Sequence, residues 1–149
     1  MALEADVRHL SRIPTFAVLD FDALRLLAVG AETVTLRRGE VLFRRDEASD
    51  GGFVLISGAI ALDPGEFGQG EQLVRPPTLI GDMALITKTR RPATAIAREP
   101  STLLKISRQL FHRMLNDSPT SAERLKRILS DQLLAFMRDL DGIMRNEEG

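Results

Sequence analysis

The residues best suited to chemistry lie in one segment, GDMALITKTRRPATA, at positions 81–95. A strand-like run ends just before Gly81, and the short apolar run MALI that follows Asp82 has the length of one helical turn. Backbone N–H groups at the start of a helix attract anions, and a neighbouring glycine allows close approach. Arg91, ten residues after Gly81, carries a guanidinium that matches two phosphate oxygens. The segment therefore predicts a phosphate site.

Asp82 restricts which phosphate would fit. A carboxylate repels a phosphate, but it accepts hydrogen bonds from a sugar hydroxyl. These residues together favour a ribose phosphate of low charge. The alternative is a loop that binds nothing, since a glycine, an acid and an arginine occur together in many domains. The order strand, helix, strand within a β-rich segment favours the phosphate site.

The remaining sequence predicts the elements that position this segment. Apolar residues at helical spacing predict two short helices within residues 1–31. Alternating and β-branched runs with glycine turns predict short strands over residues 32–107. Helical spacing returns over residues 108–149, with Ser118 or Thr120 as the cap of a long last helix. The predicted fold class is one mainly β domain with flanking helices, a barrel or jelly roll.

The predicted last helix carries an apolar seam. Its spacing of 4, 3, 4, 3 is that of a coiled coil, formed by Leu129, Leu133, Phe136, Leu140 and Ile143. Further apolar residues widen the seam, namely Leu125, Ile128, Leu134, Met137 and Met144. We predict that this helix pairs with a second copy in a homodimer. The alternative is that the seam packs wholly against its own barrel.

Composition argues against several classes of function. The net charge of -1 with 28% charged residues gives no basic footprint for nucleic acid or acidic membranes. The absence of cysteine excludes disulfides, thiolate catalysis and cysteine-bound zinc. His9 and His112 lack partners at ligand spacing, so no metal site, catalytic residue or cofactor is expected, and the chain is not expected to be an enzyme. Without a signal core or an apolar run of about 20 residues, we expect a cytoplasmic protein.

The segment GDMALITKTRRPATA resembles the phosphate-binding cassette of the cyclic nucleotide-binding domain family. That family includes catabolite activator proteins, regulatory subunits of cAMP-dependent kinase and cyclic-nucleotide-gated channels. Other stretches resemble the family in the same order, namely IPTF with DFDALRLLA, then LRRGEVLFRRDEASDGGFVLISGAIAL, then EPSTLLKISRQLFHRML. The resemblance implies a single domain over 1–149, a β jelly-roll barrel with N-terminal helices, a short helix in the cassette at residues 81–94, and C-terminal B and C helices.

The resemblance also implies roles for the cassette residues. Gly81 and the amides of Met83 and Ala84 are expected to bind the cyclic phosphate. Arg91 is expected to pair with the phosphate, and Asp82 to take the ribose 2′-hydroxyl.

The residues after Arg91 complete the expected ligand-binding set, Pro92, Ala93 and Thr94. Thr94 is expected to order or contact the base region. Arg90 is an alternative to Arg91, but the pattern RPAT, positions 91–94, matches the family with Arg91 facing the phosphate.

Two positions depart from the family pattern. Asp82 stands where glutamate is usual, and its shorter side chain implies weaker ribose recognition or contact through water. Pro92 stands where the family donates a backbone N–H to the phosphate, and proline has none. The missing hydrogen bond implies a loss on the order of 1.5–3 kcal/mol, roughly ten- to hundredfold in affinity.

The expected function is a non-catalytic regulatory sensor of cAMP or cGMP. Movement of the C-terminal helix over the base would signal to an unidentified effector protein, with Ser130, Asp131 and Gln132 as candidates for base contact. The alternative is a degenerate fold that serves as a protein-interaction or scaffold module without nucleotide, as Asp82 and Pro92 favour. Catabolite activator proteins append a DNA-binding helix-turn-helix, whereas this sequence ends after the long helix, so no direct DNA binding is expected.

Overall fold

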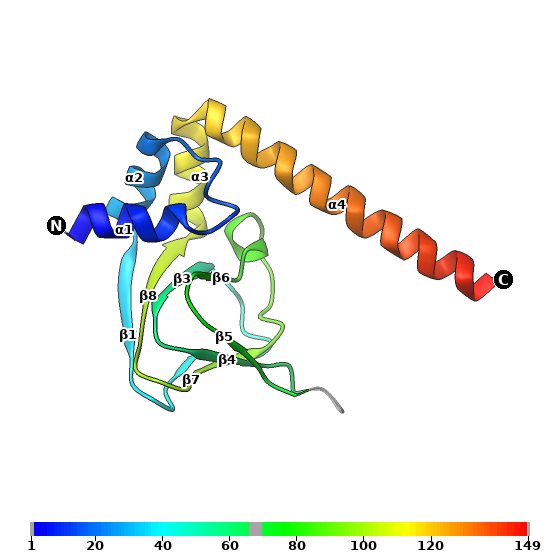
Figure 1. The fold of residues 1–149 in the computed structure, drawn as a ribbon, viewed down its shortest axis with the longest axis horizontal. Coiled ribbons are helices and arrows are strands. Elements are labelled where there is room, and N and C mark those ends of the chain that lie inside the picture. The colour runs from blue at the N-terminus through cyan, green and yellow to red at the C-terminus, as the bar shows by residue number, and fades with distance from the viewer. Residues whose placement is uncertain (1, 66–69, 149) are drawn as a thin grey trace.

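The computed structural model describes residues 2–65 and 70–148. Two helices precede the strands, as predicted: α1 (Ala2–Ser11) and α2 (Phe21–Gly30). Asp20 caps α2, because its carboxylate accepts a hydrogen bond from the Ala23 backbone N–H at 2.8 Å. Both helices lie at one end of the strands (Figure 1).

The described strands form two antiparallel sheets. Their bounds are β1 (Glu32–Leu36), β2 (Val41–Phe43), β3 (Gly51–Ser57), β4 (Ile60–Asp63), β5 (Gln72–Val74), β6 (Thr78–Ile80), β7 (Thr94–Ala97) and β8 (Ser101–Ser107). One sheet has the order β1-β8-β3-β6 and the other β2-β7-β4-β5. Most consecutive strands therefore lie in different sheets, as in a jelly roll. The predicted mainly β jelly roll with flanking helices is confirmed, with two separate four-stranded sheets rather than one closed barrel among the described residues.

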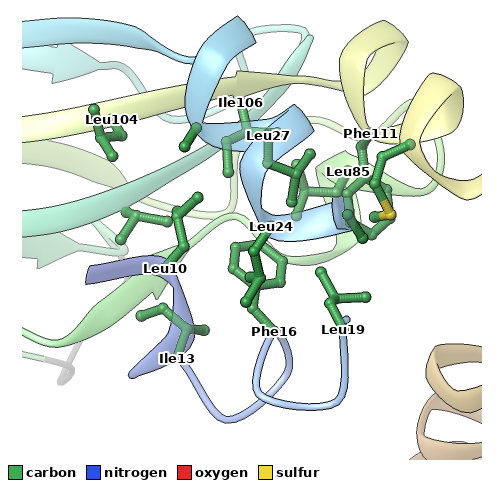
Figure 2. Close-up of a cluster of buried hydrophobic side chains, with 14 of the residues drawn as sticks. Leu10, Ile13, Phe16, Leu19, Leu24, Leu27, Leu85, Leu104, Ile106 and Phe111 are labelled. Carbon is green, nitrogen blue, oxygen red and sulfur yellow. The ribbon is translucent and has the colours of Figure 1, made fainter. Parts of the chain in front are cut away.

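Strand β8 contributes to two apolar cores, one between the sheets and one between a sheet and the helices. Leu103 belongs to the apolar cluster between the sheets, whereas Leu104 and Ile106 belong to the cluster under the helices. Successive side chains of a strand point to opposite faces, so β8 buries both of its faces. Figure 2 shows the cluster under the helices, to which Leu104 and Ile106 contribute together with Leu27 of α2 and Phe111 of α3.

Two helices follow β8, α3 (Arg108–Asp117) and α4 (Pro119–Glu148). Ser107 caps α3, because its hydroxyl accepts a hydrogen bond from the Leu110 backbone N–H at 3.0 Å. Helix α4 begins directly after Ser118, one of the two predicted caps.

Helix α4 is anchored to the domain at its first turns. The buried Ser121 hydroxyl accepts a hydrogen bond from the Asp20 backbone N–H at 3.0 Å, and Leu125 is 2% exposed. Farther along, Leu134 and Met137 are 51% and 52% exposed, and α4 extends away from the strands (Figure 1). The side chains of the other predicted seam residues lie outside the described part of the chain, namely Leu133, Phe136, Leu140, Ile143 and Met144.

Candidate functional site

A cavity of about 340 Å³, here called the cassette cavity, lies against the cassette. Its volume is within the range of roughly 300–1,000 Å³ typical of small-molecule sites. Strands β2, β4 and β6 supply further walls. Of the predicted ligand-binding residues, those that line this cavity are Gly81, Asp82, Met83, Ala84, Arg91, Pro92 and Ala93.

Gly81 has a backbone conformation and a neighbour that both require glycine. Its φ is +83°, in the left-handed region that other residues rarely adopt. A Cβ atom at this position would lie 2.6 Å from Nη1 of Arg91. Gly81 therefore leaves the space that the Arg91 guanidinium occupies.

Arg91 is a buried cation, only 4% exposed. Its guanidinium carbon lies 4.4 Å from the centre of the Phe43 ring and 5.5 Å from that of Phe53, so both rings contribute cation–π contacts. Nη1 has no hydrogen-bond partner among the described residues. Burial lowers the pKa of Arg91; the carboxylate of Asp50 opposes this shift, and the charge of Arg108 adds to it. An anion is the partner that such a group lacks.

Backbone hydrogen bonds explain why Arg91, and not Arg90, faces inward. The Arg91 N–H donates to the Glu47 carbonyl, and the Asp46 N–H donates to the Arg91 carbonyl, both at 2.8 Å. Arg90 is exposed, and its Nη1 donates to the Asp46 carbonyl at 3.0 Å. The loop before β3 therefore fixes the orientation of the two arginines.

The amides of the short helix expected to bind the phosphate are paired within the cassette in this structure. The helix is a single 3-10 turn, η1 (Met83–Leu85), capped by Asp82. The Met83 N–H donates to the Asp82 carboxylate at 2.8 Å, and the Ala84 N–H donates to the Gly81 carbonyl at 3.1 Å. The two N–H groups expected to bind the phosphate thus have acceptors within the cassette. The Asp82 carboxylate, expected to bind the ribose, is the acceptor for the Met83 N–H.

The residues after Arg91 divide between the cavity and the sheet. Pro92 and Ala93 line the cavity. The Thr94 hydroxyl instead accepts a hydrogen bond from the Arg45 backbone N–H at 3.0 Å. Since Thr94 begins β7 and Arg45 follows β2, this bond joins two neighbouring chain segments of one sheet. The structure thus places Thr94 in a structural contact.

Sequence reasoning missed the aromatic residues around Arg91. Phe43 ends β2 and Phe53 lies in β3, and their rings lie 6.0 Å apart, centre to centre. Both appear in the sequence as ordinary strand residues. No local pattern indicates that strands of different sheets bring them to the same guanidinium.

The candidate residues for base contact lie on α4. Ser130 and Asp131 are exposed, and the side chain of Gln132 lies outside the described residues. The cassette cavity is lined by strands and cassette, while Leu125 and Leu129 of α4 line a separate hollow beside Phe111. The first turns of α4 therefore lie beside this separate hollow and not at the cassette cavity.

Within residues 2–65 and 70–148, no group of three or more histidine, aspartate or glutamate side chains is arranged to hold a metal ion. His112 Nε2 lies 3.1 Å from the Ile86 carbonyl oxygen. Within the same residues, no helix combines the length and hydropathy that a membrane crossing requires.

Known proteins match both the sequence and the fold. Residues 33–118, more than half of the chain, match the cyclic nucleotide-binding domain. A cyclic nucleotide-binding-like protein from Brucella abortus is 36% identical, with a TM-score of 0.66 over 74% of this chain and 97% of that one. The N-terminal domain of a transcriptional regulator from Streptomyces coelicolor is 29% identical, with a TM-score of 0.80 over 89% of this chain and 94% of that one.

A much longer curated protein contains a similar region. The lysophospholipase nte1 of Neurospora crassa is 29% identical in an alignment of 118 residues that covers 72% of this chain and 7% of that protein. The chain therefore corresponds to a small part of that relative. The match over residues 33–118 and the shared two-sheet fold lead to one conclusion: the chain belongs to the cyclic nucleotide-binding domain family.

Proposed function

We propose that the chain is a non-catalytic sensor domain that binds cAMP or cGMP through the cyclic phosphate at the cassette cavity. The observation that carries the proposal is the buried Arg91 guanidinium, whose Nη1 lacks a partner among the described residues. Burying an unpaired cation is costly, and the cation–π contacts with Phe43 and Phe53 offset roughly 1–2 kcal/mol of that cost. A phosphate supplies the missing acceptor with matching geometry.

The contacts around Arg91 favour weak rather than tight binding. The N–H groups of Met83 and Ala84 already have acceptors, and Pro92 has no N–H to donate. Arg91 is then the main phosphate ligand. One missing charged hydrogen bond, worth on the order of 1.5–3 kcal/mol, corresponds to roughly ten- to hundredfold in affinity. The cyclic phosphate is common to cAMP and cGMP, so the proposal covers both.

Calorimetry with cAMP and cGMP tests the proposal on wild-type protein, Arg91→Met and Arg90→Met. Methionine keeps much of the buried apolar volume of Arg91 and removes the charge, so Arg91→Met should abolish binding and keep or raise the melting temperature without nucleotide. Arg90→Met removes the same charge from the exposed neighbour and should change the affinity less than about threefold. Binding by Arg91→Met, or neither heat nor thermal shift for wild type at millimolar nucleotide, would contradict the proposal.

The second candidate is a scaffold that binds no nucleotide. The pairing of the Asp82 carboxylate with the Met83 N–H favours it, because this bond closes the cassette turn on itself. The same calorimetry separates the two candidates. A scaffold would also tolerate Arg91→Met without any loss of partner binding.

We further propose that α4 carries the output. Its apolar side chains Leu134 and Met137 are exposed, which suits pairing with a second copy in a homodimer. Ser130 and Asp131 lie before this exposed stretch and are candidates for contact with the base when α4 moves toward the cavity. The partner we propose is an effector protein in the cytoplasm.

A further inference from the structure

Arg108, the first residue of α3, joins three parts of the domain through one guanidinium. Its Nε donates to the Ala84 carbonyl at 2.9 Å, and its Nη2 donates to the Ser49 carbonyl at 2.8 Å and to the Ser49 hydroxyl at 3.1 Å. Ala84 lies in η1, and Ser49 lies in the loop before β3; both are buried. A planar fork with several N–H donors can satisfy two separate carbonyls, which a lysine ammonium on a flexible stem does less well.

One acceptor residue lines the cassette cavity, and the other is bonded to a residue that does. Ala84 itself lines it, and Ser49 is bonded to a second lining residue, Thr89. The Ser49 hydroxyl and the Thr89 hydroxyl lie 2.9 Å apart, and the Ser49 N–H donates to the Thr89 carbonyl at 2.9 Å. Arg108 thus supports the cassette directly at Ala84 and, through Ser49, at Thr89, which lies two residues before Arg91.

Helix α3 contacts the cassette again one turn later. His112 Nε2 lies 3.1 Å from the carbonyl oxygen of Ile86, the C-cap residue that follows η1. Residues four apart lie on the same face of a helix, so Arg108 and His112 present two polar groups to the carbonyl end of η1. Carbonyls at a helix end need such partners, since they have none within the helix.

Arg108 also acts on the charge of the cavity. It lies near enough to Arg91 to lower the pKa of Arg91, in addition to the larger effect of burial. Arg108 does not line the cavity, but its positive charge adds to that of Arg91, against the carboxylates of Asp50 and Glu47, and so favours an anion beside Arg91. Geometry and charge therefore point to the same residue.

We propose that Arg108 is a positioning residue of the cassette cavity: it does not touch the ligand, but it fixes both limbs of the cassette in the arrangement that binds an anion. This inference rests on the proposed function, because its effect on affinity is measured with cAMP. Its effect on the structure of the cassette can be measured without nucleotide. Residues that orient the ligands of a bound metal ion commonly change its affinity about 10- to 100-fold, and we expect an effect of that order for the anion here.

The test compares wild type with Arg108→Gln, Arg108→Lys and the control Arg113→Gln. Arg113 is an exposed arginine of the same helix, so its variant removes the same charge from α3. Two readouts are taken: the cAMP dissociation constant by calorimetry, and amide hydrogen exchange of residues 84–91 in nucleotide-free protein. Circular dichroism and thermal unfolding establish that each variant is folded.

We expect Arg108→Gln to weaken cAMP binding about tenfold or more and to accelerate exchange selectively at residues 84–91. Arg108→Lys should bind cAMP more tightly than Arg108→Gln but more weakly than wild type. Arg113→Gln should match the wild-type affinity within about twofold. Wild-type affinity and exchange in Arg108→Gln, or full restoration by Arg108→Lys, would overturn the positioning role. If wild type binds no cAMP, the proposed function fails, and the exchange measurement alone decides the role of Arg108.

Discussion

Replacing Gly81 by alanine separates folding from anion binding, provided that Gly39→Ala is measured beside it. Gly81 has φ +83° and Gly39 has φ +91°, so alanine is strained at both positions. This strain costs about 1–2 kcal/mol of folding free energy at each site. The surroundings differ, because a Cβ at Gly39 has no atom within 4 Å, whereas a Cβ at Gly81 would lie 2.6 Å from Arg91 Nη1.

The contact at Gly81 gives the expected size of the binding effect. An ordinary contact begins at 3.4 Å, so the guanidinium end of Arg91 must move by about 0.8 Å. That end belongs to a flexible side chain, so the added cost in stability is small. A charged hydrogen bond displaced by this amount loses much of its roughly 1.5–3 kcal/mol, which is about ten- to hundredfold in affinity.

Urea unfolding and cAMP calorimetry of the two variants check this reasoning. Both should lose similar unfolding free energy, about 1–2 kcal/mol, while Gly81→Ala alone loses affinity. If Gly39→Ala loses affinity equally, the effect is one of general destabilisation. If Gly81→Ala binds like wild type, Arg91 does not need the space beside Gly81, and the site is misassigned.

Three further predictions concern the ribose, the acid stability and the oligomer. Because the Asp82 carboxylate accepts from the Met83 N–H, cAMP and 2′-deoxy-cAMP should bind within about threefold of each other by calorimetry, and a tenfold preference for cAMP would contradict this. Lys105, which donates to Asp50 at 2.9 Å, lowers the pKa of Asp50 below 3.8. The pair therefore stabilises the fold above about pH 4, and this stabilisation is lost as the pH falls through the folded-state pKa of Asp50. The melting temperature of Asp50→Asn should therefore decrease less than that of wild type between about pH 5 and pH 3. An equal decrease in both proteins would contradict the assignment. Sedimentation at micromolar concentration should show a wild-type dimer and a monomer for Leu134→Glu combined with Met137→Glu, and wild type found only as monomer would remove the dimer proposal.

The sequence predicts the elements well because each leaves a local pattern. Alternation in β1 and helical spacing in α2 and α3 depend on which face each residue buries, and the structure has strands and helices there. The order of the strands in each sheet cannot be predicted in this way, because no local pattern indicates that β8 pairs with both β1 and β3. The strand pattern therefore predicts a barrel or jelly roll, and the pairing that makes it two four-stranded sheets is visible only in the structure.

The same distinction applies to the site. Arg91 is identifiable because a guanidinium ten residues after Gly81 has a chemical reason to be there. Its neighbours Phe43 and Phe53 are not, since only the folded sheets bring them to 4.4 and 5.5 Å from it. The contacts of Arg108 are equally hidden, because most of its acceptors are backbone carbonyls, which every residue has. Sequence reasoning therefore finds groups with distinctive chemistry and misses the backbone that orients them.

Thermal unfolding of wild type and Arg91→Met, each with and without cAMP, distinguishes a sensor from a scaffold even before a partner is known. Replacing buried charges by apolar side chains of similar volume is often neutral or stabilising. A domain that served only as a scaffold would gain from losing the unpaired Nη1 and would lose no function. In a sensor, the Arg91 cation lowers the stability of the protein without nucleotide. It raises the stability of the nucleotide complex, because the phosphate supplies the missing hydrogen-bond acceptor. If Arg91→Met raises the melting temperature of the free protein and removes the thermal shift produced by cAMP, the cost of burying Arg91 is the basis of ligand recognition.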